Sequence, residues 1–312
     1  MSDMNDARVM VFAPAPQLTV TIEQQHDDPE LHIHPGGQGI WQTRMITSLG
    51  AEVTLCAAVG GEVGRVLKPL LDFKGVSLRT VARETGSGWY VHDRRGGSRQ
   101  EIAALPGAPL SRHELDELYN LALAEGLRAG IAILSGPAHP SVIKPAVYRR
   151  LAADLRSNGC RVIADLCGPH LRAVLEAGLN VVKVSHEELI ADGLAAGDSD
   201  ADLIGALVKL HDDGAEAALV SRADAGALAL INEEIYRVGL PRLTPAESRG
   251  AGDSMTAGVA AVLAHGGDMN EAVRTGAAAG AMNVTRHGLG TGHIDAVRVL
   301  TERVQLTPIK KA

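Results

Sequence analysis

From Ser111 onward, the sequence alternates between short apolar runs and amphipathic segments, at the spacing of β-α-β units. The predicted strands lie at 130–136, 160–166, 180–185 and 215–221, and the predicted helices at 111–127, 141–159, 169–178 and 200–214. Because these strands are apolar throughout, they are typical of a parallel sheet that helices cover on both faces. The pattern therefore predicts an α/β fold.

The N-terminal third has a different pattern. Four segments alternate polar and apolar residues, which is typical of half-exposed antiparallel strands, at 17–24, 30–35, 88–95 and 98–105. A predicted helix (38–49), strand (53–59) and helix (64–74) separate the first pair of segments from the second. We therefore expect a single domain over 1–312, with a small β-sheet lid built from two excursions at about 17–35 and 87–105. Such a sheet cannot bury both faces alone, so we also expect a homodimer formed through the lid.

Composition argues against several kinds of partner. With a formal net charge of -7, the chain offers no basic surface for nucleic acid or an anionic membrane, and 3% aromatic residues are few for stacking bases. No apolar run approaches the length of a membrane span, and the first ten residues lack the pattern of a signal peptide. Three cysteines without a Cys-x-x-Cys pair favour a reduced, cytoplasmic location.

The segment "RGAGDSMTAG" at 249–258 places three small residues, Gly250, Ala251 and Gly252, directly before Asp253 and a helix-like apolar run. The first N–H groups of a helix are unpaired and carry a positive field, and small residues let an anion approach them. We expect this field to keep Asp253 ionised at neutral pH, so that it could take a proton from a hydroxyl beside a transferring phosphoryl group. The alternative is a glycine turn in which Asp253 is an ordinary N-cap.

Three other motifs are weaker. An Ala/Gly-rich helix and a Gly-rich loop at 272–292 could admit a flat ligand such as adenine, or could serve only for close helix packing. The segment "VGGEVG" at 59–64 lacks the first glycine of a dinucleotide-binding loop and is interpreted as a tight strand-to-helix turn. His32 and His34 share a strand face, but no third metal ligand is evident, so solvent-facing histidines are the simpler interpretation.

The segments "GGQGI", "VSRADAGALAL", "GAGDSMTAG" and "GAAAGAMNVTRHGLGTG", in this order, resemble the PfkB (ribokinase-like) family of sugar kinases. The resemblance is strongest to the branch of 1-phosphofructokinase and tagatose-6-phosphate kinase and spans nearly the whole chain. It implies a three-layer α/β/α ribokinase-like core with a small β-sheet lid, and ATP and Mg²⁺ as cofactors. It also implies ATP-dependent phosphoryl transfer to a hydroxyl of a sugar or sugar phosphate.

The resemblance also implies roles for individual residues. Asp253 would be the general base, and Gly250, Ala251 and Gly252 would form the anion hole. The segment "KVSHEEL" at 183–189 resembles the family's Lys-Pro-Asn-x-x-Glu-Leu. This likeness implies that Lys183, Ser185 and Glu188 lie near the phosphates and magnesium, and that Glu188 binds the metal through a water molecule. The nucleotide-binding residues would be Lys183, Ser185, Glu188, Ser221, Gly226 and Asn283, and the substrate-binding residues Gln17, Gly36, Gly37, Gln38 and Arg94.

Four positions depart from the family pattern, and two of them concern the substrate. Gln17 stands where the family has an aspartate, Gln38 where the branch has a lysine, Ser185 where the motif has an asparagine, and Arg249 where an apolar residue is usual. A basic hairpin with Arg94, Arg95 and Arg99 could replace the lost lysine and keep a sugar phosphate as substrate. Otherwise the site accepts a neutral polyol or another hydroxyl compound. The whole-chain resemblance and the basic hairpin favour the sugar phosphate.

Two alternatives to a sugar kinase stay open: a nucleoside kinase of the same fold, and a catalytically weak sugar-binding homologue. An oxidoreductase has the least support, because the dinucleotide-binding loop is incomplete.

Overall fold

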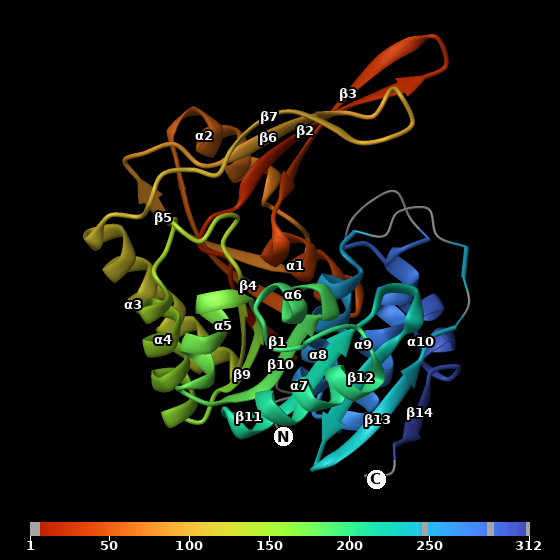
Figure 1. Cartoon of the computed structure of the whole chain (residues 1–312). Helices are drawn as coiled ribbons and strands as arrows, with labels where there is room; N and C mark the ends of the chain where they lie inside the picture. Colours follow the sequence, from red (N-terminus) through yellow and green to blue (C-terminus); the bar gives the residue numbers. More distant parts are fainter. Residues whose placement is uncertain (1–6, 242, 245–248, 286–289, 310–312) are drawn as a thin grey trace, which may run out of the picture.

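The computed structural model describes residues 7–241, 243–244, 249–285 and 290–309. The strands of the larger sheet are β1 (Arg8–Phe12), β4 (Glu52–Gly60), β5 (Val76–Arg83), β8 (Ile131–Ser135), β9 (Arg161–Asp165), β10 (Leu179–Ser185), β11 (Ala215–Ser221), β12 (Ala227–Ile231), β13 (Glu234–Gly239) and β14 (Gln305–Pro308). Their order in the sheet is β14-β13-β12-β11-β10-β9-β8-β1-β4-β5 (Figure 1). Every pairing from β5 to β11 is parallel, so the carboxyl ends of these strands meet at one edge.

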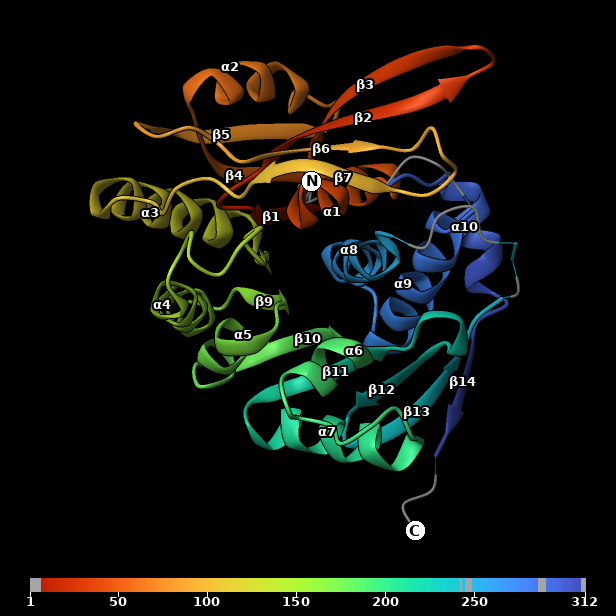
Figure 2. The ribbon, with the colours of Figure 1, turned by 45° about the horizontal axis from the view of Figure 1, so that its top comes forward.

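The helices are α1 (Gln38–Ser48), α2 (Gly61–Leu70), α3 (Arg112–Ala129), α4 (Pro145–Ser157), α5 (Gly168–Leu175), α6 (His186–Ala191), α7 (Asp200–Asp212), α8 (Ala251–Ala264), α9 (Met269–Asn283) and α10 (Ile294–Thr301). Helices α3, α4, α5 and α7 pack against one face of the larger sheet, and α1, α8, α9 and α10 against the other (Figure 2). Both faces of the strands are buried, since Met10 and Phe12 join one core and Val9 and Val11 the other. The predicted three-layer α/β/α core is confirmed.

Local chemistry sets several helix boundaries. A capping box at Ser111 begins α3, with Glu114 accepting a hydrogen bond from the Ser111 N–H at 2.7 Å. Helix α4 begins at Pro145, later than the predicted 141, because proline has no N–H and suits the first helical position. Helix α2 spans 61–70 and not 64–74, because the turn at Gly60 and Gly61 already starts the helix.

The prediction of a purely parallel sheet does not extend to one edge. Strands β12, β13 and β14 add three antiparallel pairings after β11. A tight turn at Asn232 and Glu233, both with positive φ, joins β12 to β13. Strands β1 and β5, which the helix-strand alternation did not predict, complete the other side of the sheet.

Four strands form a second, four-stranded sheet, which we call the small sheet: β2 (Gln17–Gln25), β3 (Asp28–Gly36), β6 (Trp89–Asp93) and β7 (Gln100–Leu105). Their order is β3-β2-β6-β7, and the small sheet projects from the top of the view in Figure 1. Its two hairpins leave the chain between β1 and α1 and between β5 and α3. The prediction that all pairings are antiparallel is wrong for the central pair, because β2 and β6 are parallel. The two strands belong to different hairpins and no turn joins them, so their relative direction depends on how the two hairpins pack together.

The register of the small sheet separates a polar face from an apolar one. Thr19 pairs with His34 and Tyr90, so these three side chains share one face, whereas Leu18 and its neighbours occupy the other. His32 lies on the polar face, 3.4 Å from Glu30, and the described part of the chain holds no group of three or more potential metal-ligating side chains. No helix in that part is long and apolar enough to cross a membrane.

Candidate active site

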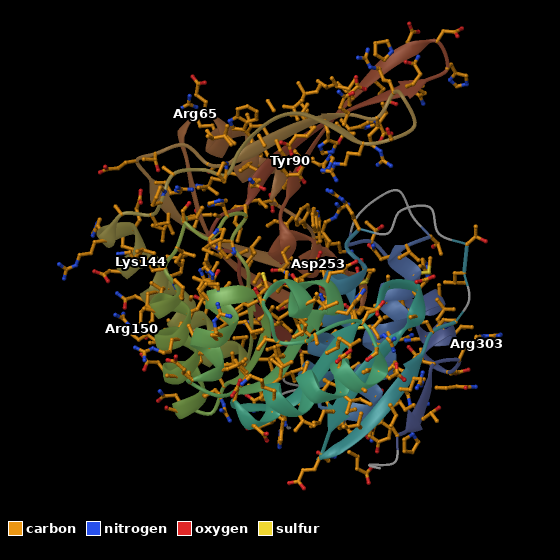
Figure 3. The ribbon with its side chains drawn as sticks, viewed as in Figure 1. Arg65, Tyr90, Lys144, Arg150, Asp253 and Arg303 are labelled. Carbon is orange, nitrogen blue, oxygen red and sulfur yellow. The ribbon has the colours of Figure 1, made fainter. Side chains whose placement is uncertain are left out.

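The segment 249–258 forms the beginning of α8, at the edge where the parallel strands end. Gly250 is the N-cap, with φ 73°, a left-handed conformation that glycine adopts without strain. Asp253 is the third helical residue, so it is not the N-cap that the alternative interpretation required. Figure 3 shows Asp253 on the upper side of the α/β body, below Tyr90 of the small sheet.

Gly252 lies against the side chain of Lys183, which extends from β10. A methyl group added at Gly252 would overlap the Lys183 ammonium group. The absence of a side chain at Gly252 therefore lets a buried cation lie directly beside the first turn of α8.

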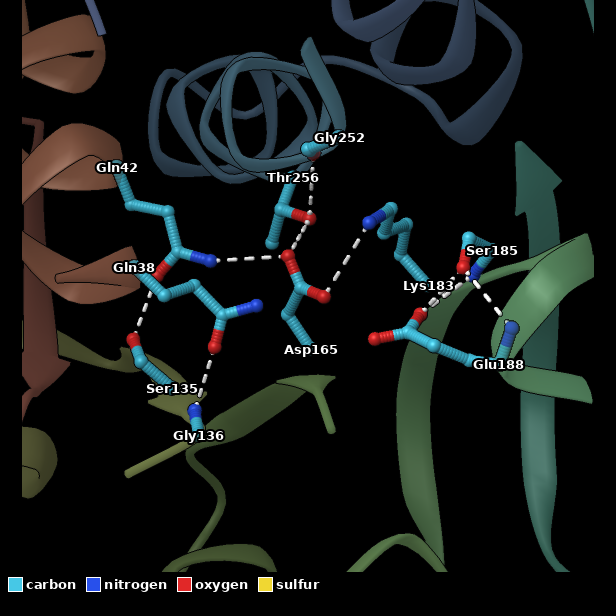
Figure 4. A network of polar contacts seen from close by, with 10 residues as sticks. All are labelled: Gln38, Gln42, Ser135, Gly136, Asp165, Lys183, Ser185, Glu188, Gly252 and Thr256. Carbon is cyan, nitrogen blue, oxygen red and sulfur yellow. Dashed lines mark hydrogen bonds and ion pairs between the residues drawn. The ribbon is translucent and has the colours of Figure 1, made fainter. Parts of the chain in front are cut away.

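A carboxylate that the sequence analysis did not single out organises this region (Figure 4). Asp165, the last residue of β9, is 2% exposed and accepts hydrogen bonds from Gln42 Nε2 at 3.0 Å and Thr256 Oγ1 at 2.7 Å. The Lys183 Nζ lies 3.4 Å from its Oδ1. Asp165 thereby connects α1, α8 and β10. The sequence could have indicated Asp165 by its position at the carboxyl end of a predicted parallel strand, because ligand sites of α/β sheets lie at that edge.

The electrostatic surroundings of Asp253 differ from the expectation. Burial above all, and then the nearby charge of Asp165, raise the pKa of Asp253 to about 7. The charge of Lys183 and a hydrogen bond from Gln38 act in the opposite direction. Enclosure and a second carboxylate thus act against the helix field that was predicted to keep Asp253 ionised at neutral pH.

Lys183 keeps its positive charge although its side chain is almost fully buried. Burial alone would lower its pKa, but the charges of Asp165, Asp253 and Glu188 outweigh burial and raise the pKa. The region thus holds one ammonium group among three carboxylates. Such a cluster of buried charges with shifted pKa values is typical of functional sites.

A cavity of about 790 Å³, the larger cavity, opens at the start of α8. The predicted site residues that line it are Gln38, Lys183, Ser185, Glu188, Ser221, Gly226, Ala251, Gly252 and Asp253. One wall consists of small side chains of α9, among them Ala277, Gly280 and Ala281. The Ala/Gly-rich helix therefore lines a cavity, and it also packs closely, since a methyl group at Gly258 would lie 2.7 Å from the Gly276 Cα.

Ser185 and Glu188 support each other at the beginning of α6. The Glu188 Oε2 accepts hydrogen bonds from both N–H and Oγ of Ser185 at 2.8 Å, and the Ser185 hydroxyl caps the Glu188 N–H. Ser185 thus acts as an N-cap where the resembling motif has asparagine, and it holds the Glu188 carboxylate at the cavity wall.

A cavity of about 540 Å³, the smaller cavity, adjoins the larger one. It is lined by Gln17, Gly37 and Gln38 among the predicted substrate residues, and by Asp165, Glu188 and Asp192. Gln38 and Glu188 line both cavities. The Gln38 Oε1 accepts a hydrogen bond from the Gly136 N–H at 2.6 Å, while the same side chain hydrogen bonds Asp253. Asp253 itself lines the larger cavity, next to Gln38, which borders both.

Four predicted site residues do not line either cavity: Gly36, Arg94, Gly250 and Asn283. Asn283 is fully buried, and its amide joins two backbone groups, the Arg249 carbonyl at 2.6 Å and the Gly290 N–H at 2.9 Å. The Arg94 Nη1 lies 3.6 Å from Glu23 on the small sheet. Part of the predicted Gly-rich loop, 286–289, lies outside the described residues.

Positive charges gather around His92 on the small sheet. His92 is 4% exposed, its Nε2 lies 3.1 Å from the Thr21 hydroxyl, and its Nδ1 lies 3.1 Å from the Arg99 guanidinium. Burial first, and then the charges of Arg99, Arg249 and other neighbours, lower the pKa of His92 to about 4. The ring is therefore neutral at pH 7, so the charge of this cluster comes from its arginines.

Comparisons with known proteins agree with this arrangement. The model of the pfkB family carbohydrate kinases matches residues 9–296. The chain is 31% identical over 258 residues to the ATP-dependent 6-phosphofructokinase isozyme 2 of Escherichia coli (strain K12), covering 81% of this chain and 82% of that protein. It is 27% identical over 275 residues to the 1-phosphofructokinase of Bacillus subtilis (strain 168), covering 88% of each.

Among solved structures, the phosphofructokinase-2 of Escherichia coli in complex with potassium superposes with a TM-score of 0.82 at 27% identity, covering 95% of this chain and 98% of that one. The ribokinase of Arabidopsis thaliana, at 18% identity and a TM-score of 0.73, shares the fold and confirms the ribokinase-like prediction. A family match over almost the whole length and a shared fold together show that this chain belongs to the pfkB family of carbohydrate kinases.

Proposed function

We propose that this chain transfers the γ-phosphoryl group of ATP to a hydroxyl of a sugar or sugar phosphate, with Asp253 as the general base. The observation that carries the proposal is the position of Asp253, a buried carboxylate in the first turn of α8 that lines the larger cavity. A carboxylate whose pKa is raised to about 7 is well matched to proton transfer near neutral pH.

The backbone at the start of α8 would hold the transferring phosphoryl group. The first N–H groups of a 14-residue helix have no partner within the helix, and Gly250, Ala251 and Gly252 leave them accessible. The Lys183 ammonium beside Gly252 adds a full positive charge at this place. Negative charge that develops on the phosphoryl oxygens would thus be stabilised by groups already in position.

The larger cavity would hold the nucleotide, with its phosphates towards Lys183 and Gly252 and its base along the small side chains of α9. Ser221 and Gly226, at the end of β11 and before β12, line the phosphate side. Magnesium is usually bound by one or two carboxylates together with phosphates and waters. The Glu188 carboxylate, held by Ser185 in the cavity wall, has the hard oxygen chemistry for this role through water.

The smaller cavity would hold the acceptor, because Gln38 connects it directly to Asp253. A hydroxyl entering from that side would meet the base, while the phosphoryl donor lies on the other side. The identity to sugar phosphate kinases favours a sugar kinase over a nucleoside kinase. A silent binding protein would have no use for a buried carboxylate beside an accessible helix start.

The test is a screen for ADP formation with MgATP and a panel of sugars, sugar phosphates and nucleosides, followed by identification of the phosphorylated product by ³¹P NMR. We expect one class of sugar or sugar phosphate to give a phosphate ester and stoichiometric ADP. A nucleoside monophosphate as the best product would favour the nucleoside kinase. No phosphorylated product from any acceptor would refute the proposal.

A further inference from the structure

We propose that the acceptor of this chain carries no negative charge and is an uncharged polyol or sugar, not a sugar phosphate. The inference rests on the proposed function, in that it takes the smaller cavity as the acceptor site. The chemistry of the residues that line this cavity carries it.

The charged side chains at the smaller cavity are carboxylates. Asp165, Glu188 and Asp192 line it, and none of the lysines and arginines that the structure describes does so. Asp192 is fixed in place, because its carboxylate accepts a hydrogen bond from the Gly168 N–H. A phosphate ester seated here would lie against these carboxylates, and the cation beside them, Lys183, is already paired with Asp165. Like charges at short range repel strongly away from water.

The three arginines of the basic hairpin contact other residues of the small sheet. The Arg95 Nη2 lies 2.7 Å from the Asp93 carboxylate, and the Arg94 Nη1 lies 3.6 Å from Glu23. The Arg99 guanidinium lies 3.1 Å from His92 Nδ1 and 5.4 Å from the centre of the Tyr90 ring. Each of these side chains thus has a partner outside the smaller cavity.

The remaining lining suits an uncharged compound with many hydroxyls. Gln17 and Gln38 present side-chain amides, which both donate and accept hydrogen bonds. Pro16, Pro137 and Trp41 supply apolar surface, on which the C–H face of a ring can rest.

The sequence provides a direct reporter for this site. The chain has two tryptophans, and Trp41 lines the smaller cavity while Trp89 lies in the small sheet. In a Trp89→Phe variant that melts like the unchanged chain, Trp41 is the single tryptophan and can be excited selectively over the tyrosines. We would titrate this variant, in the presence of a non-hydrolysable ATP analogue and Mg²⁺, with matched pairs: fructose with its 1- and 6-phosphates, tagatose with its 6-phosphate, and ribose with its 5-phosphate. Uncharged inositols and hexitols complete the panel.

We expect at least one uncharged compound to change the Trp41 fluorescence saturably, and its phosphate ester to bind at least about tenfold more weakly. Tighter binding of any phosphate ester than of its parent sugar would overturn the inference, and so would a panel in which no uncharged compound binds. Arg94→Ala and Arg99→Ala should leave the order of affinities unchanged.

A charge-insertion variant gives an independent test. Ala138 is exposed at the rim of the smaller cavity, so a longer side chain can be accommodated there. Ala138→Lys should raise the affinity for the phosphate esters by about tenfold or more, as expected for one charge-assisted hydrogen bond. Ala138→Gln, with similar length and no charge, should not. An equal effect of the two changes would contradict the absence of a native cation in this site.

The result can be separated from the test of the proposed function. Binding is measured without turnover, so an uncharged ligand that binds but is not phosphorylated would support the inference and count against the kinase activity. Conversely, efficient phosphorylation of a phosphate ester would uphold the kinase activity and overturn the inference.

Discussion

The Lys183 ammonium and the Asp165 carboxylate form an ion pair whose side chains are only 8% and 2% exposed, with Nζ 3.4 Å from Oδ1. The pair joins β10 to β9 and holds a positive charge beside Gly252 at the beginning of α8. Since Asp165 also raises the pKa of Asp253, this one carboxylate influences both the cation and the proposed base.

Asp165→Asn should therefore change stability and catalysis together. Removing one partner of a buried ion pair typically costs about 3–5 kcal/mol, because the other charge is left without compensation. We expect a fall of this order in the free energy of unfolding, measured with urea. Loss of the like charge should also lower the pKa of Asp253 and move the acid limb of kcat/KM to lower pH. Asp213→Asn, whose partner Lys209 is exposed, is the control and should change little.

Asp253→Asn should abolish turnover and leave nucleotide binding nearly unchanged. The amide keeps the shape of the side chain and cannot accept the hydroxyl proton, so kcat should fall by on the order of a hundredfold or more. Burial raises the pKa of Asp253 above its value in the unfolded chain, so ionisation destabilises the fold as the pH rises through about 7. The variant should thus melt above the unchanged chain at pH 8, with a difference that shrinks towards pH 4. Near-normal kcat would mean that Asp253 is not the base.

The pH dependence should report on Gln38. The unprotonated form of Asp253 is the active one, so kcat/KM should fall as the pH decreases below about 7. The hydrogen bond from Gln38 favours the ionised carboxylate, and Gln38→Ala should therefore raise the pKa of Asp253 and shift the acid limb to higher pH. Gln24→Ala, in an exposed part of β2, serves as the control. If the acid limb does not move in Gln38→Ala, Gln38 does not influence the group whose titration produces that limb.

Gly252→Val should weaken ATP binding much more than ADP binding. The branched side chain would displace the Lys183 ammonium and crowd the first turn of α8, where the γ-phosphate is proposed to bind. Isothermal titration calorimetry with both nucleotides would measure the difference. Gly205→Val, on α7 where an added side chain meets no neighbour, is the matched control. Equal losses for ATP and ADP would indicate general damage to the fold.

The small sheet should mediate a homodimer. It exposes large apolar side chains on both of its outer strands, with Leu31 at 59% and Ile33 at 47% on β3, and Ile102 at 56% and Leu105 at 51% on β7. We expect light scattering to give a dimer at micromolar concentration and Ile33→Glu to weaken it. Val299→Glu, at an equally exposed apolar position on α10, should have no such effect. An active monomer at this concentration would contradict the prediction.

Periodicity and local chemistry were sufficient to predict the layered core, the two excursions that form the small sheet, and the helix that begins next to Asp253. They were insufficient wherever the outcome depends on residues far apart in the sequence. Asp165 owes its role to Gln42 and Thr256, which are 123 and 91 residues away. The pKa of Asp253 depends on enclosure, which local sequence does not encode, and the same is true of the buried position of Asn283.

The parallel pairing of β2 with β6 has a consequence for how the chain folds. It brings Thr21 and His92 together although they are 71 positions apart in the sequence, and two of the strands between them, β4 and β5, belong to the other sheet. Such non-local contacts form late, because the entropy of closing the loop is lost before the contact is gained. The small sheet is therefore expected to assemble on an already formed β1-β4-β5 edge, and its amide hydrogens should exchange with solvent before those of the larger sheet.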